Sequence, residues 1–86
     1  MNSLIGQYVN KLTINNINDF ALKNNINLNE NELNILLNVA KNHYREVLNG
    51  NDLEVINYLK DNLSKDNYDK IISLYNEYKN KYQGYL

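Results

Sequence analysis

The chain has 86 residues, nine of them basic and ten acidic, and its net charge at pH 7 is −1. This length gives room for one domain, residues 1–86, with one modest core. The absence of cysteine excludes disulfides, thiolate metal sites and cysteine nucleophiles, and the balanced charge lacks the basic excess typical of proteins that contact nucleic-acid phosphates.

The first predicted helix lies near the N-terminus. Its apolar positions recur at i, i+1, i+4, i+5 and i+8, which is one helical face made of Leu4, Ile5, Tyr8, Val9 and Leu12. Ser3 or Asn2 is suited to cap it.

A second, shorter helix is expected from about Asn16 to Asn24. Asn16 followed by Asp19 resembles a capping box, so we expect Asn16 to be the N-cap. The apolar face of this helix consists of Ile17, Phe20 and Ala21. Residues 24–28 break the helical period and predict an extended linker held by its two apolar residues, Ile26 and Leu28.

The third predicted helix has the clearest pattern. Asn29 and Glu32 match a capping box, and an acidic first turn suits the positive end of the helix dipole. An apolar stripe then continues to Asn49, where Gly50 can supply a left-handed C-cap. The stripe consists of Leu33, Leu36, Leu37, Ala40, Tyr44, Val47 and Leu48.

Two further helices are expected. Asn51 with Glu54 predicts the start of a fourth, which buries Leu53, Ile56, Leu59 and Leu63. Ser64 is expected to cap a fifth, which continues to about Tyr82 and ends at Gly84. Short connections favour antiparallel or steeply crossed neighbours. The sequence therefore predicts an all-α fold, a compact array of about five helices, orthogonal or bundle-like, with the third and fifth as the two long ones.

One face of the fifth predicted helix carries a series of tyrosines at 3-4-3-4-3 spacing: Tyr68, Ile71, Tyr75, Tyr78, Tyr82 and Tyr85. We expect its first part to face the core, together with Ile72. Its last part can extend beyond a small core, and tyrosine is favoured at protein interfaces because it combines a large ring with a hydroxyl. The candidate partner surface is Tyr78, Lys79, Lys81, Tyr82 and Tyr85.

Few side chains in the sequence suit catalysis. His43 is the only histidine, so no multi-histidine metal site can form, and a cation late in a helix is favourable for the dipole alone. The carboxylates are scattered, and the three glycines do not form a phosphate-binding loop. We expect no enzyme, no cofactor, no metal and no small-molecule substrate. A deep pocket that gathers His43, Glu46 and another polar side chain would favour an enzyme instead.

Nucleic-acid binding is the alternative. Residues 17–37 could form a helix-turn-helix, but its second helix would bring two acids, Glu30 and Glu32, toward the phosphates. A helical hairpin that simply packs is the better interpretation. Lys79, Lys81 and the nearby rings could still stack on single-stranded RNA or DNA.

Most of the chain resembles a known family. The residues that carry the likeness lie between Ile17 and Tyr82: the segments 17–21 and 25–29, a long amphipathic helix, Gly50, and a closing helix from Tyr68 and Ile71 to Tyr78. They resemble a family of short all-helical proteins, a domain of unknown function, from low-GC Gram-positive bacteria. The resemblance implies an all-helical cytoplasmic protein and adds no site residue. Twenty asparagines and no proline agree with an A/T-rich bacterial genome.

These patterns together predict a non-enzymatic helical protein-interaction or structural module, which binds a protein partner or a second copy of itself through its last helix. The alternative is weak RNA or DNA binding. No apolar run exceeds three residues, so we expect no membrane span, and the lack of a basic segment before an apolar run predicts a cytoplasmic protein.

Overall fold

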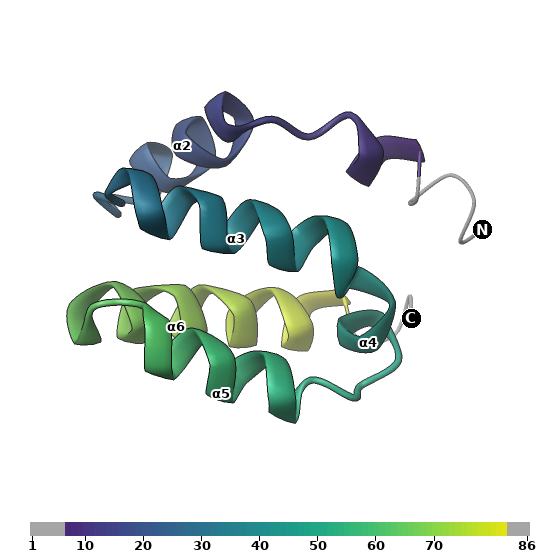
Figure 1. Cartoon of the computed structure of the whole chain (residues 1–86). Coiled ribbons are helices and arrows are strands. Elements are labelled where there is room, and N and C mark those ends of the chain that lie inside the picture. Colours follow the sequence, from purple (N-terminus) through teal and green to yellow (C-terminus); the bar gives the residue numbers. More distant parts are fainter. Residues whose placement is uncertain (1–6, 83–86) are drawn as a thin grey trace.

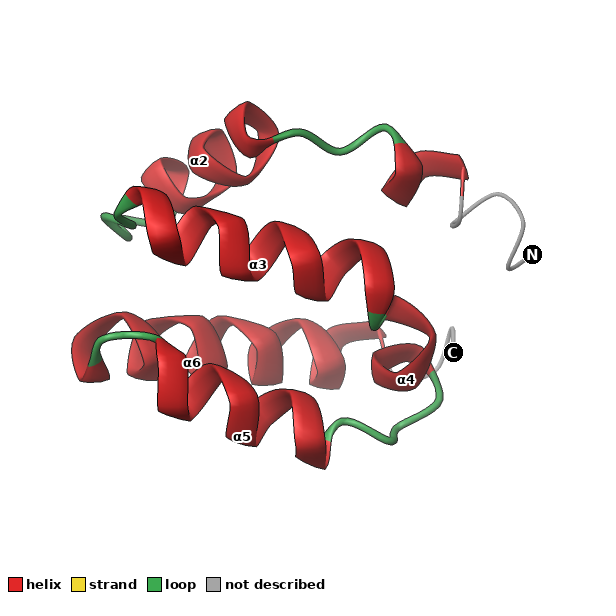
Figure 2. Ribbon diagram, in the orientation of Figure 1, coloured by secondary structure: helices red, strands yellow, loops and turns green. Residues whose placement is uncertain are grey.

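The computed structural model describes residues 7–82, except for the side chains of Leu48, Lys81 and Tyr82. The helices are α2 (Ile14–Lys23), α3 (Glu30–Asn42), α4 (Tyr44–Leu48), α5 (Leu53–Asn62) and α6 (Lys65–Tyr82), preceded by a helical turn at 7–10. No strand occurs within this range (Figure 2), which confirms the all-α prediction. The predicted positions 2–5, Gly84 and Tyr85 lie outside the described residues.

The helices form two stacked pairs (Figure 1). One pair is α2 with α3, the other is α5 with α6, and α4 joins them at one end. The longest helices are α3 and α6, with 13 and 18 residues, as predicted. The core between the pairs consists of Ile35, Val39, Val55, Leu59 and Leu63, with Leu36, Val47, Tyr68 and Ile71 packed against it.

The start of α2 differs from the prediction. Thr13 is the N-cap, in an extended conformation, and Asn16 is the third helical residue. The Thr13 hydroxyl accepts from the Asn16 backbone N–H at 3.2 Å, and the Asn16 side chain accepts from the Thr13 backbone N–H at 3.0 Å. The prediction that Asn16 is the cap was wrong because its amide oxygen takes the place that Glu or Gln usually has in a capping box.

The end of α2 places Asn25 in the left-handed region, at φ 61°. The backbone N–H of Ile26 donates to the carbonyl of Ala21 at 2.9 Å, and that of Asn25 donates to the carbonyl of Leu22 at 3.1 Å. This pair of bonds is a Schellman motif. Ile26 and Ala21 are each 1% exposed, so the predicted role of Ile26 as an anchor is confirmed.

The capping box at the start of α3 is confirmed: Asn29 accepts from the Glu32 backbone N–H, and Glu32 accepts from the Asn29 backbone N–H. The predicted unbroken helix to Asn49 was wrong, because α3 ends at Asn42 and His43 leaves the helical conformation. Both residues are weak helix formers. The change of direction allows Val47 of α4 to pack on the core.

Gly50 ends α4 at φ 82°, as predicted, and α5 begins at Leu53. Its N-cap is Asp52 and not Asn51, and the Asp52 side chain makes no capping bond. Leu53 is 70% exposed although it was predicted to be buried, whereas Val55 is 6% exposed. The buried stripe of α5 begins at Val55, and Leu53 lies two residues away from it, nearly on the opposite face of the helix.

The start of α6 is fixed by a hydrogen-bonded cluster that the sequence did not reveal. Ser64 caps the helix as predicted, because its hydroxyl accepts from the Asn67 backbone N–H at 3.2 Å. The Ser64 backbone N–H donates to Glu32 at 2.9 Å, and the Asn67 amide donates to Glu32 and to the carbonyl of Asn27, each at 2.9 Å. One carboxylate therefore joins the first turns of α3 and α6. We call these four residues, Asn27, Glu32, Ser64 and Asn67, the polar cluster.

Candidate functional site

The most distinctive feature of the described residues is an apolar cavity of about 400 Å³ between the two helical pairs. All five helices contribute to its walls, and Asp52 is the one residue among them with a formal charge. The lining residues are Ile17, Phe20, Leu36, Val39, Ala40, Tyr44, Val47, Asp52, Val55, Ile56, Leu59, Ile71, Ile72, Leu74, Tyr75 and Tyr78. Several of them, such as Leu36, Ala40 and Ile72, are only half-buried because the space beside them is unfilled.

The mouth of the cavity lies where α2 approaches α6. Phe20 and Tyr78 line the cavity and are also 44% and 41% exposed. Their ring centroids are 6.3 Å apart, and the rings are tilted by 41°, which is within the range of favourable aromatic pairs. These two rings bridge helices that lie far apart in the sequence.

The polar part of the cavity wall is formed by Asp52 and Tyr75. The Tyr75 hydroxyl donates to Asp52 Oδ2 at 2.5 Å, and Lys79 Nζ lies 3.3 Å from the same oxygen. The Tyr75 hydroxyl, together with Lys79, holds the pKa of Asp52 below its usual range. Burial, followed by the bond to Asp52 and its charge, raises the pKa of Tyr75 to about 12. Asp52 is therefore an anion whose charge is balanced by a neighbouring ammonium group.

The predicted partner surface is only partly described. Tyr78 is exposed, and Lys79 contacts Asp52 and lies 5.7 Å from the centre of the Tyr75 ring. Lys81 and Tyr82 belong to α6, but their side chains are not described, and Tyr85 lies outside the described residues. The core-facing prediction for Tyr68 and Ile71 is confirmed, and Ile72 and Tyr75 line the cavity.

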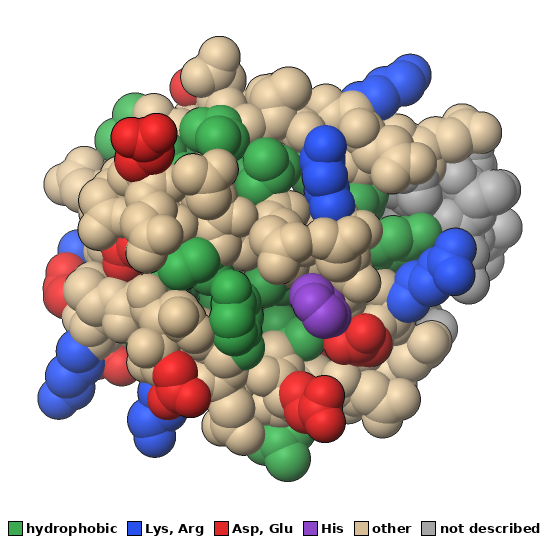
Figure 3. All heavy atoms as spheres, in the orientation of Figure 1, with side chains coloured by type: hydrophobic (Ala, Val, Ile, Leu, Met, Phe, Trp, Pro, Cys, Tyr) green, Lys and Arg blue, Asp and Glu red, His purple; other side chains and the backbone are tan. Residues whose placement is uncertain are grey.

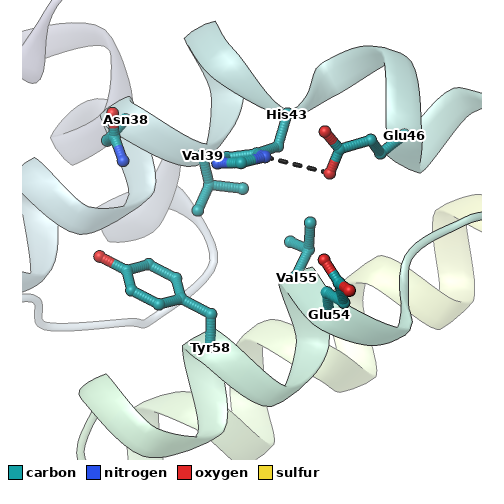
Figure 4. Close-up of a pocket in the computed structure, with 7 residues that line it drawn as sticks. All are labelled: Asn38, Val39, His43, Glu46, Glu54, Val55 and Tyr58. Carbon is teal, nitrogen blue, oxygen red and sulfur yellow. Dashed lines mark hydrogen bonds and ion pairs between the residues drawn. The ribbon is translucent and has the colours of Figure 1, made fainter.

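A second, smaller cleft of about 260 Å³ contains His43 (Figure 4). His43 Nδ1 lies 3.0 Å from Glu46 Oε2, and Glu54 and Tyr58 of α5 face them across the cleft. The His43 and Glu46 side chains are 40% and 45% exposed. The cleft gathers His43 and Glu46 with further polar side chains, the arrangement that would favour an enzyme. Histidine, glutamate and tyrosine can all act in catalysis, but the two central side chains here stay in contact with water.

The surface around this cleft is mixed. Figure 3 shows hydrophobic side chains in the middle of this face, next to the histidine, and basic side chains dispersed over it, most of them toward its edge. Among the residues that the structure describes, no three histidine or carboxylate side chains are grouped as a metal site would require. No helix within 7–82 combines the length and apolarity needed to cross a bilayer.

The chain matches none of the family models, curated proteins or solved structures with which it was compared. Its resemblance to the low-GC Gram-positive family therefore stays a prediction, and the candidate site rests on geometry. The cavity was not predicted because helical periodicity shows which side chains face inward and not how completely they fill the interior. The role of Asp52 was not predicted either, because its carboxylate accepts a hydrogen bond from Tyr75 of α6 and makes no local capping bond.

Proposed function

We propose that this chain is a non-enzymatic, cytoplasmic helical interaction module that contacts another protein through the edge formed by Phe20, Tyr78 and the end of α6. The pair of exposed aromatic rings at the mouth of an apolar cavity carries this proposal. Exposed aromatic side chains beside apolar surface are enriched in protein interfaces. A second copy of the chain is the first partner to test, because the low net charge of −1 opposes self-association only weakly.

The environment of Lys79 favours a protein over a nucleic acid as the partner. Its ammonium group is 3.3 Å from the Asp52 carboxylate, so contact with a phosphate would have to compete with this ion pair. A mobility assay at low salt tests the alternative, and retention of RNA or DNA that weakens steeply with salt would favour it.

Sedimentation across a range of concentrations tests the proposal. The wild type should self-associate, and Tyr78→Ser should weaken association by at least about tenfold, which corresponds to 1.4 kcal/mol. The triple variant Tyr78/Tyr82/Tyr85→Ser extends the test to all three tyrosines of the predicted surface. Tyr58→Ser is a matched control, because Tyr58 is also 41% exposed but lies on α5 beside the His43 cleft.

Two outcomes would contradict the proposal. A strictly monomeric wild type would remove the second copy as the partner. An equal loss of association in Tyr58→Ser would show that any exposed aromatic ring contributes to association, and that the mouth of the cavity has no special role.

A further inference from the structure

The cavity has a size that suits a small molecule. Its volume is about 400 Å³, within the range of ligand pockets. If each non-hydrogen atom of a ligand occupies roughly the 30 Å³ of a liquid water molecule, about a dozen atoms fill it. A larger lipid would extend through the mouth between Phe20 and Tyr78.

The walls of the cavity favour hydrocarbon over a peptide. A peptide segment would bring backbone N–H and C=O groups into the cavity, and each would need a hydrogen-bond partner there. Apart from Asp52 and the tyrosine hydroxyls, the lining side chains offer none. An aliphatic chain has no such requirement, so it can occupy the whole apolar part.

The polar part of the wall selects the head group. The Asp52 carboxylate has room for about four hydrogen bonds, and those from Tyr75 and Lys79 both go to Oδ2. A hydroxyl on the ligand can therefore donate to Asp52. An anionic head would be repelled by Asp52 and a cationic one by Lys79, and because these two charges balance, a neutral head is favoured.

We propose that the cavity between the two helical pairs binds a small neutral amphiphile, an aliphatic chain of about ten carbons that ends in a hydroxyl group. The chain lies among the apolar residues of α3, α5 and α6, and the hydroxyl donates to Asp52. This site is separate from the protein contact proposed above, which uses the outer faces of the rings at the mouth.

Titration calorimetry with the purified full chain tests this site, with n-decanol, decanoate and decylammonium as probes at neutral pH. We expect n-decanol to bind saturably at one molecule per chain and to raise the unfolding temperature. The two charged probes, which have the same chain length, should bind at least about tenfold more weakly, since a tenfold ratio corresponds to only 1.4 kcal/mol.

Ala40→Leu tests the location of the site, because its added carbons enter the cavity from α3. It should weaken n-decanol binding at least about tenfold while the helical circular dichroism and a cooperative unfolding transition are retained. Asn31→Leu is the control, since it places the same leucine side chain at an exposed position of the same helix, outside the cavity. Self-association should persist in Ala40→Leu, which separates this site from the proposed protein interface.

Asp52→Asn tests the head group and distinguishes binding from a purely structural role. It leaves Lys79 without its carboxylate, so decanoate binding should strengthen and n-decanol binding weaken, and their order should invert. Three results would overturn the proposal: no saturable binding of n-decanol by the wild type, unchanged binding in folded Ala40→Leu, or an unchanged order of probes in Asp52→Asn. If the wild type binds no probe and Ala40→Leu unfolds at a higher temperature, the cavity is a loosely packed core.

Discussion

The two ends of α6 are held in different ways. At its first turn, Ser64 and Asn67 are joined to the carboxylate of Glu32 by direct hydrogen bonds, and Glu32 and Asn67 are 3% and 8% exposed. Three turns later, Tyr75 and Tyr78 border an apolar cavity of about 400 Å³. No buried side-chain polar atom in the described part of the chain lacks a partner.

This difference means that one end of α6 determines how the helices are aligned, whereas the other can leave room for a bound molecule. Hydrogen bonds are directional, so the polar cluster fixes how α3 and α6 are aligned. Apolar contacts are not directional, and helices held by them can leave space for other molecules. We therefore expect the beginning of α6 to dominate stability and its later turns to tolerate substitution.

The largest effect should come from Glu32→Gln. Gln keeps one acceptor oxygen, but an NH₂ group replaces the other. The donors that pointed to the replaced oxygen, from Asn29 and Asn67 or from Ser64, then have no acceptor. Hydrogen bonds to a charged group contribute about 1.5–3 kcal/mol each, so we expect a loss of about 3 kcal/mol in the free energy of unfolding. Urea denaturation followed by circular dichroism measures it.

Glu30→Gln is the matched control for that prediction. Glu30 is in the same first turn of α3, but it is exposed, and its carboxylate forms no hydrogen bond or ion pair that the structure records. Its removal should cost about 0.5 kcal/mol through the helix dipole. Equal losses in both variants would show that the polar cluster does not hold the two helices together.

Acid should weaken the polar cluster. Burial alone would raise the pKa of Glu32, but the bonds from the Ser64 and Asn29 backbone and from Asn67 outweigh it and leave the pKa below its usual value. Because the pKa is lowered in the folded state, the contribution of Glu32 to the free energy of unfolding is complete above the pKa of the unfolded state, about 4.3. It is lost as the pH falls through the pKa of the folded state. Unfolding free energies measured from neutral pH downward should be level and then decline below about pH 4.3.

Asp52 titrates in the same direction, so part of this decline should remain in Glu32→Gln. The variant should nevertheless show a shallower slope than the wild type. An identical slope in the two proteins would assign the acid sensitivity to other carboxylates.

The contrast between the two ends of α6 also shows which features could be predicted from the sequence and which could not. The capping box of α3, the Ser64 cap and the glycine end of α4 depend on residues within a few positions of one another, and these were predicted correctly. The predicted caps Asn16 and Asn51 were wrong, because Thr13 and Asp52 hold those positions. The bonds from Glu32 to Ser64 and Asn67 cross more than thirty positions, and no local pattern pairs them. The cavity depends on how the side chains of all five helices fill one space, which periodicity does not measure.

A smaller effect is expected from Tyr75→Phe. The change removes the hydroxyl that donates to Asp52 and leaves Lys79 as a partner, so it should cost about 1.5 kcal/mol. The pKa of Tyr75 is raised to about 12, so its neutral hydroxyl stabilises the fold fully at pH values below the usual tyrosine pKa of about 10. The wild type should therefore lose stability as the pH rises from about 10 to about 12, and Tyr75→Phe should lose less over that range.

The smallest effect is expected at the mouth of the cavity, and a double-mutant cycle can isolate it. Phe20 and Tyr78 have their ring centroids 6.3 Å apart and remain 44% and 41% exposed, so the pair should contribute about 0.5 kcal/mol beyond the burial of each ring. Phe20→Leu, Tyr78→Leu and the double variant give this coupling energy from urea denaturation, because the effects of each residue on its other neighbours cancel.

The cycle is informative because it separates two descriptions of the mouth. A coupling near 0.5 kcal/mol would mean that the rings close the cavity weakly, so that an amphiphile could separate them at low cost. A coupling energy above about 2 kcal/mol would mean that this edge contributes about as much to stability as the polar cluster does. The expected difference between the two ends of α6 would then be contradicted.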